Sequence, residues 1–130
     1  MLLTIDIGNT NITLGLYQGD LLGPRWRLAT VHDRMPDEYG LQFIGLLEHA
    51  GIKVEQVLGI CMASVVPPLT GKVIDACQHY LKQEPLVVDA ELKSGVRILY
   101  EHPNAVGADR IVDAAAVLKL YGGPACVVDF

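Results

Sequence analysis

The chain contains 130 residues with a mass of 14.1 kDa, and 51% of them are hydrophobic while 19% are charged. This length suits one compact domain or slightly more, and this composition excludes intrinsic disorder. Ten Lys and Arg against fifteen Asp and Glu give a net charge of −5, which argues against nucleic acid and acidic membrane surfaces as partners. A phosphate site must therefore be built locally, from backbone amides, a metal ion or one placed cation.

The three cysteines stand apart, with no zinc-ligand spacing and an odd count that does not suit a disulfide framework. We expect Cys61, Cys77 and Cys126 to be small buried hydrophobic side chains in a reducing cytoplasm. The apolar start is interrupted by Asp6 and is too short for a secretory signal. No run approaches the roughly 18 apolar residues of a membrane span. The sequence therefore predicts a cytoplasmic protein without a membrane partner.

The first third of the chain is predicted to form three antiparallel strands. Residues 2–7 are a nearly continuous apolar run that ends in turn residues, and apolar side chains alternate with small or polar ones over residues 12–17. A third strand is expected over residues 21–30, with Pro24 at a bulge or an edge. Three antiparallel strands in succession exclude the common nucleotide-binding opening in which a helix follows the first strand.

Helices and strands then alternate. Helical periodicity predicts three helices, over residues 36–50, 68–81 and 108–121. Short apolar runs predict strands over residues 57–63, 85–88, 96–99 and 125–130. The inward face of the last helix is expected to carry Ile111, Val112, Ala115, Val117 and Leu118.

The last predicted strand repeats the ending of the first, because each is an apolar run closed by an acid and one more hydrophobic residue. Asp129-Phe130 thus echoes Asp6-Ile7, which indicates a duplicated domain whose second copy has barely begun. We therefore expect a first domain over residues 1–122, the start of a truncated second domain over residues 123–130, and a chain that is a fragment.

The turn after the first strand is a candidate phosphate site. Gly8 lets the backbone approach a ligand, and Asn9, Thr10 and Asn11 add short donors beside exposed amides. A bare carboxylate at Asp6 would repel a phosphate by roughly 4 kcal/mol at about 4 Å and an effective dielectric near 20. A magnesium ion between the two groups reverses the sign of that interaction. The alternative is an ordinary hairpin with a side chain bonded to its own turn.

The start of the last helix is a second candidate site. Arg110 suits a bidentate grip on a substrate carboxylate, and Asp109 suits accepting the proton of an attacking hydroxyl. Alternatively, Asp109 caps the helix and Arg110 pairs with Asp113. The P-loop, the GxGxxG turn after a strand, the HExxH zinc motif and the hydrolase elbow are all absent from the sequence.

In these residues the chain resembles the type III pantothenate kinases over its whole length. Four segments in the family's order carry the resemblance: Asp6–Asn11, Ser64–Pro68, Tyr100 with Pro103 and Gly107–Ile111, and Val128–Phe130. They are similar, in turn, to the family's first phosphate motif, its middle strand-to-helix junction, its substrate and catalytic segment, and the start of its second phosphate motif.

The resemblance implies an α/β enzyme of the acetate and sugar kinase, heat-shock ATPase and actin superfamily. Its first ribonuclease H-like domain would have a mixed sheet that opens with three antiparallel strands and continues with alternating helices and strands. The implied activity is ATP-dependent phosphorylation of pantothenate to 4'-phosphopantothenate, the first step of coenzyme A biosynthesis. The implied assembly is a homodimer whose substrate pocket is completed across the interface.

The resemblance also implies roles for individual residues. ATP would be bound by Asp6, Ile7, Gly8, Asn9, Thr10, Asn11, Ile12 and Thr13, with Mg²⁺ near Asp6, directly or through water. Pantothenate would be held by Tyr100, Gly107, Ala108, Asp109 and Arg110, with Asp109 as the proton acceptor. Asp129 would help to bind the monovalent cation, K⁺ or NH₄⁺. The opening turn and the start of the last helix would face a common cleft.

Two departures from the family pattern stand out. His102 occupies a position where the family commonly has Asn, and the family's second half, beginning with a Gly-Thr turn, does not follow Phe130. We therefore expect the chain by itself to bind ATP poorly and to turn over little. Three alternatives stay open, namely a non-catalytic regulator of the same superfamily, a kinase for another small acidic alcohol, and an α/β interaction domain. The presence of Asp6, Asp109 and Arg110 argues against the first alternative, and the apolar last strand argues against the third.

Overall fold

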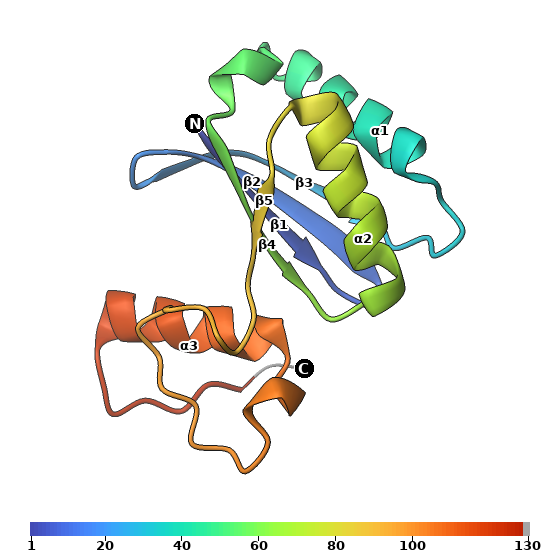
Figure 1. The fold of residues 1–130 in the computed structure, drawn as a ribbon. Coiled ribbons are helices and arrows are strands. Elements are labelled where there is room, and N and C mark those ends of the chain that lie inside the picture. The colour runs from blue at the N-terminus through green and yellow to red at the C-terminus, as the bar shows by residue number, and fades with distance from the viewer. Residues whose placement is uncertain (129–130) are drawn as a thin grey trace. The chain divides into compact units, whose positions relative to one another are not determined.

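The computed structural model describes residues 1–128, which form two compact units divided between Val87 and Val88 (Figure 1). The first unit contains one mixed sheet with the strand order β3-β2-β1-β4-β5. Its strands are β1 (Leu2–Ile7), β2 (Asn11–Gln18), β3 (Leu21–Ala29), β4 (Gly59–Ser64) and β5 (Pro85–Val87). β1, β2 and β3 pair antiparallel, whereas β4 pairs parallel with both β1 and β5. The predicted opening of three antiparallel strands is confirmed.

The edge strand β3 contains Pro24, as the sequence indicated. The register between β2 and β3 shifts between Gly15 and Tyr17, close to the point where Pro24 lies on the opposite strand. A proline has no amide to donate to a ladder, so an edge position beside an irregularity is where a sheet tolerates it.

Two helices lie side by side on one face of the sheet of the first unit (Figure 1). α1 (Pro36–His49) begins with a proline and two acids in its first turn, and the Glu38 carboxylate accepts the Met35 amide at 2.8 Å. It ends before Gly51, which has a φ of 72° that favours glycine. α2 (Pro67–Ala76) begins with two prolines and continues into the π-helical segment η2 (Cys77–Leu81). A short 3₁₀ turn, η1 (Val54–Gln56), precedes β4.

The core of the first unit lies between this sheet face and the two helices. Alternate residues of the strands point into it, which is why the strand periodicity was readable from the sequence. The predicted helical stripes are also buried there, including Tyr39, Phe43, Leu47, Leu69, Val73 and Leu81. Cys77 belongs to the same core, and burial raises the pKa of its thiol from 9.0 to about 12.

α1 and η2 approach closely at one glycine. A Cβ atom on Gly40 would overlap the ring of Tyr80, so a side chain at this position would force the ring to shift. The Tyr80 hydroxyl donates a hydrogen bond to Asp37 at 2.8 Å, which raises the pKa of the tyrosine. The contact therefore combines close packing with one polar link between the two helical segments.

The second unit begins at Val88 and contains the 3₁₀ turn η3 (Pro103–Ala105) and the helix α3 (Ala108–Tyr121). Residues 96–99 and 125–128 are in no strand, so both strand predictions are wrong for these positions. A strand forms only where a neighbour completes its ladder, and apolar character alone does not supply that neighbour. Residues 129 and 130 of the last predicted strand lie outside the described part of the chain.

The last helix is less buried than its periodicity predicted. Ala108 and Ile111 are buried and Val112, Ala115 and Val117 are half-buried, whereas Leu118 is 53% exposed. Its expected inward position is therefore wrong. The prediction that all three cysteines are buried is wrong as well, because Cys61 is half-buried and Cys126 is exposed. No helix within residues 1–128 combines the length and the apolar character needed to cross a membrane.

Candidate functional site

The turn between β1 and β2 forms the first candidate site. The Gly8 amide donates to the Asn11 carbonyl at 2.9 Å, and Asn9 and Thr10 are the exposed residues between them. A Cβ atom on Gly8 would lie 3.2 Å from the Asn11 carbonyl oxygen, so a side chain there would need this carbonyl to move by a few tenths of an ångström. The short side chains and the glycine together leave the backbone of this turn accessible to a ligand.

The segment Ser64–Pro68, which joins β4 to α2, lies beside this turn. Ser64, the last residue of β4, pairs in register with Ile7, the last residue of β1, and the Val65 amide donates to the Ile7 carbonyl at 3.0 Å. The Ser64 hydroxyl oxygen accepts hydrogen bonds from the Val66 amide at 3.2 Å and from the Thr70 hydroxyl at 2.8 Å. The parallel strands β1 and β4 therefore end together, beside the amino terminus of α2, and this edge of an α/β sheet is where ligands commonly bind.

Asp6 is exposed and lies one residue before the end of β1. Its register partners are Thr13 in β2 and Ala63 in β4, and its neighbours Ile5 and Ile7 point into the core on the other sheet face. A carboxylate oxygen is a ligand of the kind that Mg²⁺ prefers, so this residue fits an ion held jointly with phosphate and water oxygens. Within residues 1–128, no group of three or more His, Cys, Asp or Glu side chains gathers into a metal site built from protein ligands alone.

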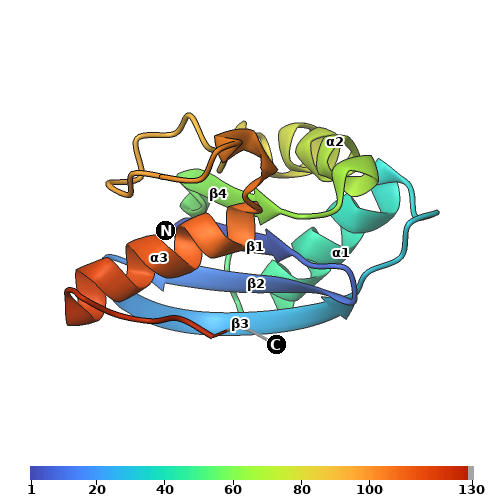
Figure 2. The ribbon, with the colours of Figure 1, turned by 90° about the horizontal axis from the view of Figure 1, so that it is seen from below.

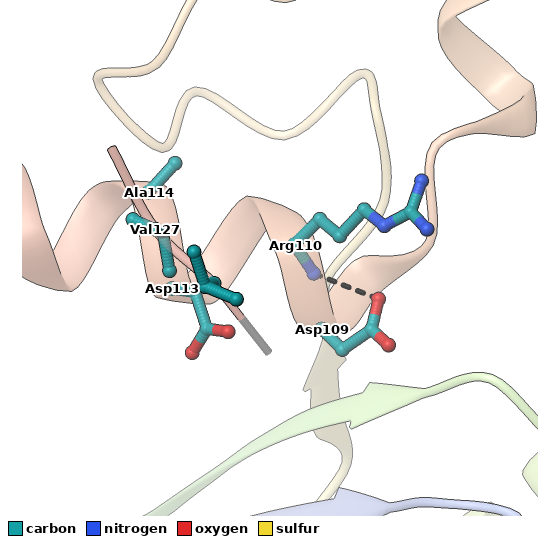
Figure 3. A pocket seen from close by; sticks show the side chains of 6 residues that line it. Asp109, Arg110, Asp113, Ala114 and Val127 are labelled. Carbon is teal, nitrogen blue, oxygen red and sulfur yellow. Dashed lines mark hydrogen bonds between the residues drawn. The ribbon is translucent and has the colours of Figure 1, made fainter. Parts of the chain in front are cut away.

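The start of α3 forms the other candidate site, in the second unit. One oxygen of the Asp109 carboxylate accepts the Arg110 amide at 2.7 Å, so Asp109 satisfies an amide of the first helical turn, while Gly107 occupies the capping position (Figure 3). The alternative in which Asp109 caps the helix is therefore wrong, and its catalytic role stays a prediction. Figure 3 shows the carboxylates of Asp109 and Asp113 on the same side of the helix, whereas the guanidinium of Arg110 extends away from Asp113.

A pocket of about 490 Å³ lies against this helix start (Figure 3). Its lining residues are Asp109, Arg110, Asp113, Ala114, Val127 and Val128. Of these, only Asp109 and Arg110 were predicted from the sequence to belong to a site. Asp113 was recognisable in principle, because a residue four positions after Asp109 lies on the same helix face. Val127 carried no signal, because its approach to α3 depends on the fold of the chain after the helix.

Among the described residues, the others predicted to bind substrate or a cation do not line this pocket. Tyr100 is 62% exposed in the irregular segment before η3 and does not line this pocket. Ala108 is buried and Gly107 is half-buried at the start of α3. Asp129, the expected cation ligand, lies outside the described residues. The β1–β2 turn and the start of α3 belong to different compact units, so their facing a common cleft stays a prediction.

The mixed sheet with three antiparallel strands, followed by alternating helices and strands, defines an α/β domain of the ribonuclease H-like, actin-like class. Comparison with known proteins then identifies the family within this class. The family model of the type III pantothenate kinases matches residues 2–130, and the chain belongs to that family.

Curated relatives named type III pantothenate kinase match the chain closely. The protein of Thermomicrobium roseum is 49% identical over 130 residues, which are 100% of this chain and 50% of that protein. The Halalkalibacterium halodurans and Brevibacillus brevis proteins are 45% and 47% identical over the same length, which is 51% of each. The chain therefore spans about half the length of the curated relatives it matches.

Proposed function

We propose that this chain forms part of an enzyme that transfers the γ-phosphoryl group of ATP to the primary hydroxyl of pantothenate, the first step of coenzyme A biosynthesis. Membership of the family supports the reaction. The observation that carries the assignment of a nucleotide site is the shared end of β1 and β4, where the β1–β2 turn and the start of α2 lie together.

ATP phosphates would bind at that edge, through residues 6–13. The exposed turn presents backbone amides and short polar side chains, and the positive end of α2 lies beside it. Asp6 would hold Mg²⁺, directly or through its waters, and the ion when bound neutralises phosphate charge. Without the ion this carboxylate would repel the nucleotide, so Asp6 makes ATP binding dependent on magnesium.

Pantothenate would bind at the start of α3, through Tyr100 and the segment from Gly107 to Arg110. The exposed guanidinium of Arg110 suits the substrate carboxylate. Asp109 would orient the primary hydroxyl and accept its proton as the new oxygen–phosphorus bond forms and the bond to the β-phosphate oxygen breaks, which releases ADP. Its hydrogen bond to the Arg110 amide holds one carboxylate oxygen in place and leaves the other for the substrate.

The remaining assignments follow the family resemblance. Asp129 would help to bind K⁺ or NH₄⁺, the enzyme would be a cytoplasmic homodimer, and residues 1–122 and 123–130 would belong to two successive domains. Because the chain spans about half of its relatives, we propose that it binds ATP weakly on its own and turns over little or not at all.

The test is the Asp109→Asn variant in a protein that joins this chain to the remaining half found in its relatives. Pantothenate-dependent formation of ADP should fall by about 10²–10⁴-fold, because the amide cannot accept the proton. Asp75→Asn, on the exposed surface of α2, is the matched control and should keep full turnover. Near-normal turnover of Asp109→Asn, with a wild-type circular dichroism spectrum, would remove Asp109 from this role.

A further inference from the structure

The β1–β2 turn is braced by a residue outside the family-like segment. Thr30 follows β3 directly and is half-buried. Its hydroxyl donates to the Gly8 carbonyl at 2.7 Å, and its amide donates to the Thr10 carbonyl at 2.9 Å. Figure 2 shows the turn and the end of β3 meeting at the same edge of the sheet. One residue, distant in sequence, therefore holds two carbonyls of the turn.

These two bonds fix which way the peptide groups of the turn face. In a trans peptide, the carbonyl of one residue and the amide of the next point to opposite sides of the chain. Holding the Gly8 carbonyl toward Thr30 therefore turns the Asn9 amide away from Thr30, and holding the Thr10 carbonyl does the same to the Asn11 amide. Two carbonyl oxygens are thus directed to one side of the turn and two amides to the other.

This division of the turn matters for an anionic ligand. Amide groups attract phosphate oxygens, whereas carbonyl oxygens repel them. If the peptide after Gly8 rotated, it would exchange a donor for an acceptor at the surface that faces the ligand. The glycine permits such a rotation more readily than any other residue would. A bond that holds its carbonyl therefore has a larger effect here than in a regular strand.

We propose that Thr30 is a positioning residue that orients the peptide groups of the β1–β2 turn for a nucleotide polyphosphate. This inference rests on the proposed function, since it assumes that the turn binds phosphate. Thr30 acts through Gly8 and Thr10 and does not itself contact the nucleotide. Its hydroxyl bond to Gly8 is the part of the brace that a substitution can remove, because the bond to Thr10 uses the Thr30 backbone amide.

The test compares three variants of the protein that joins this chain to the second half found in its relatives. Thr30→Val removes the hydroxyl and keeps the branched shape, and Thr30→Ser keeps the hydroxyl. Thr4→Val is the matched control, because the Thr4 hydroxyl also donates to a glycine carbonyl, that of Gly15 at 3.0 Å, in the middle of the same sheet. For each variant we would measure the dissociation constant of Mg²⁺-ADP by calorimetry and the KM values for ATP and pantothenate.

Thr30→Val should weaken Mg²⁺-ADP binding and raise the KM for ATP by about tenfold, with the KM for pantothenate unchanged. Thr30→Ser should restore wild-type values, and Thr4→Val should leave them unaltered. Equal nucleotide binding by wild type and Thr30→Val would overturn this inference alone. A wild-type protein that binds no nucleotide would overturn the proposed function, and the inference with it.

Two further outcomes also decide the matter. If both KM values rise together and serine does not restore them, the hydroxyl supports the fold in general, and the positioning role is wrong. If Thr30→Val does not fold, Thr30→Ala removes the same hydroxyl with a smaller side chain. If that variant also fails to fold while Thr4→Val folds, the bond holds the sheet together, and the inference is overturned.

Discussion

The two compact units bury their apolar side chains to different degrees. In the first unit, β1, β2 and β4 place their alternate residues against two helices, and the resulting core is almost inaccessible to solvent. In the second unit, Leu118, Leu120 and Tyr121 at the end of α3 are 53%, 70% and 82% exposed. An amphipathic pattern therefore predicts that a helix has an apolar face, but whether that face is buried depends on what the rest of the chain packs against it.

The largest expected effect comes from comparing one buried apolar residue of a helix in the first unit with one exposed apolar residue of the helix in the second. Phe43→Ala, in α1, should destabilise the protein by about 3–5 kcal/mol because it leaves a cavity between the helix and the sheet. Leu118→Ala, in α3, should cost less than about 0.5 kcal/mol because this side chain is already exposed. Urea unfolding followed by circular dichroism and by the fluorescence of Trp26 measures both changes. Similar losses in the two variants would show that Leu118 is covered in solution.

A smaller effect is expected from two glycines of the same helix in the first unit. Gly40→Ala should destabilise by about 1–3 kcal/mol because the added methyl group would overlap the Tyr80 ring. Gly45→Ala has no neighbouring atom within 4 Å of the new methyl group, so it should stabilise the helix by up to about 1 kcal/mol. The opposite signs can be read from thermal unfolding curves. Stabilisation by both alanines would mean that the Tyr80 ring does not pack against Gly40, and that α1 and η2 lie further apart there.

The same contrast explains which parts of the fold were predictable from the sequence. β1, β2 and α1 bury one face each, so their periodicity located their ends to within one residue. Residues 96–99 have strand-like composition, but a strand depends on a partner that the local sequence does not specify. Leu118 was misplaced for the related reason that helical periodicity does not reveal what packs against it.

Some residues of the candidate sites could also be predicted from the sequence, whereas others could not. The turn after β1 was predictable because its glycine and short polar residues act locally. Thr30 was not, because its hydrogen bond to Gly8 joins residues 22 positions apart and uses a backbone carbonyl that every residue possesses. Likewise, Val127 and Val128 line the pocket beside Asp109 because the chain after α3 folds back along the helix. Nothing in the identity of these two residues predicted that position.

The smallest expected effect compares a buried cysteine of the first unit with an exposed one of the second. Burial raises the pKa of the Cys77 thiol from 9.0 to about 12, so the folded state holds this proton more tightly than the unfolded state does. The contribution of the protonated Cys77 thiol to the stability of the folded state is therefore complete below about pH 9, and it is lost as the pH rises toward 12. By pH 10 the free energy of unfolding should have fallen by roughly 1 kcal/mol from this group, because the unfolded thiol ionises first.

Cys77→Ala isolates that contribution, since it creates a cavity at every pH but removes the ionisable group. Between pH 7 and pH 10 the wild type should therefore lose about 1 kcal/mol more stability than Cys77→Ala, as measured by urea unfolding at each pH. Cys126→Ala is the control, and it should follow the wild type because that side chain is exposed. If the stabilities of wild type and Cys77→Ala changed with pH in the same way, water would have access to the Cys77 sulfur. The solvent-inaccessible core of the first unit would then not include η2.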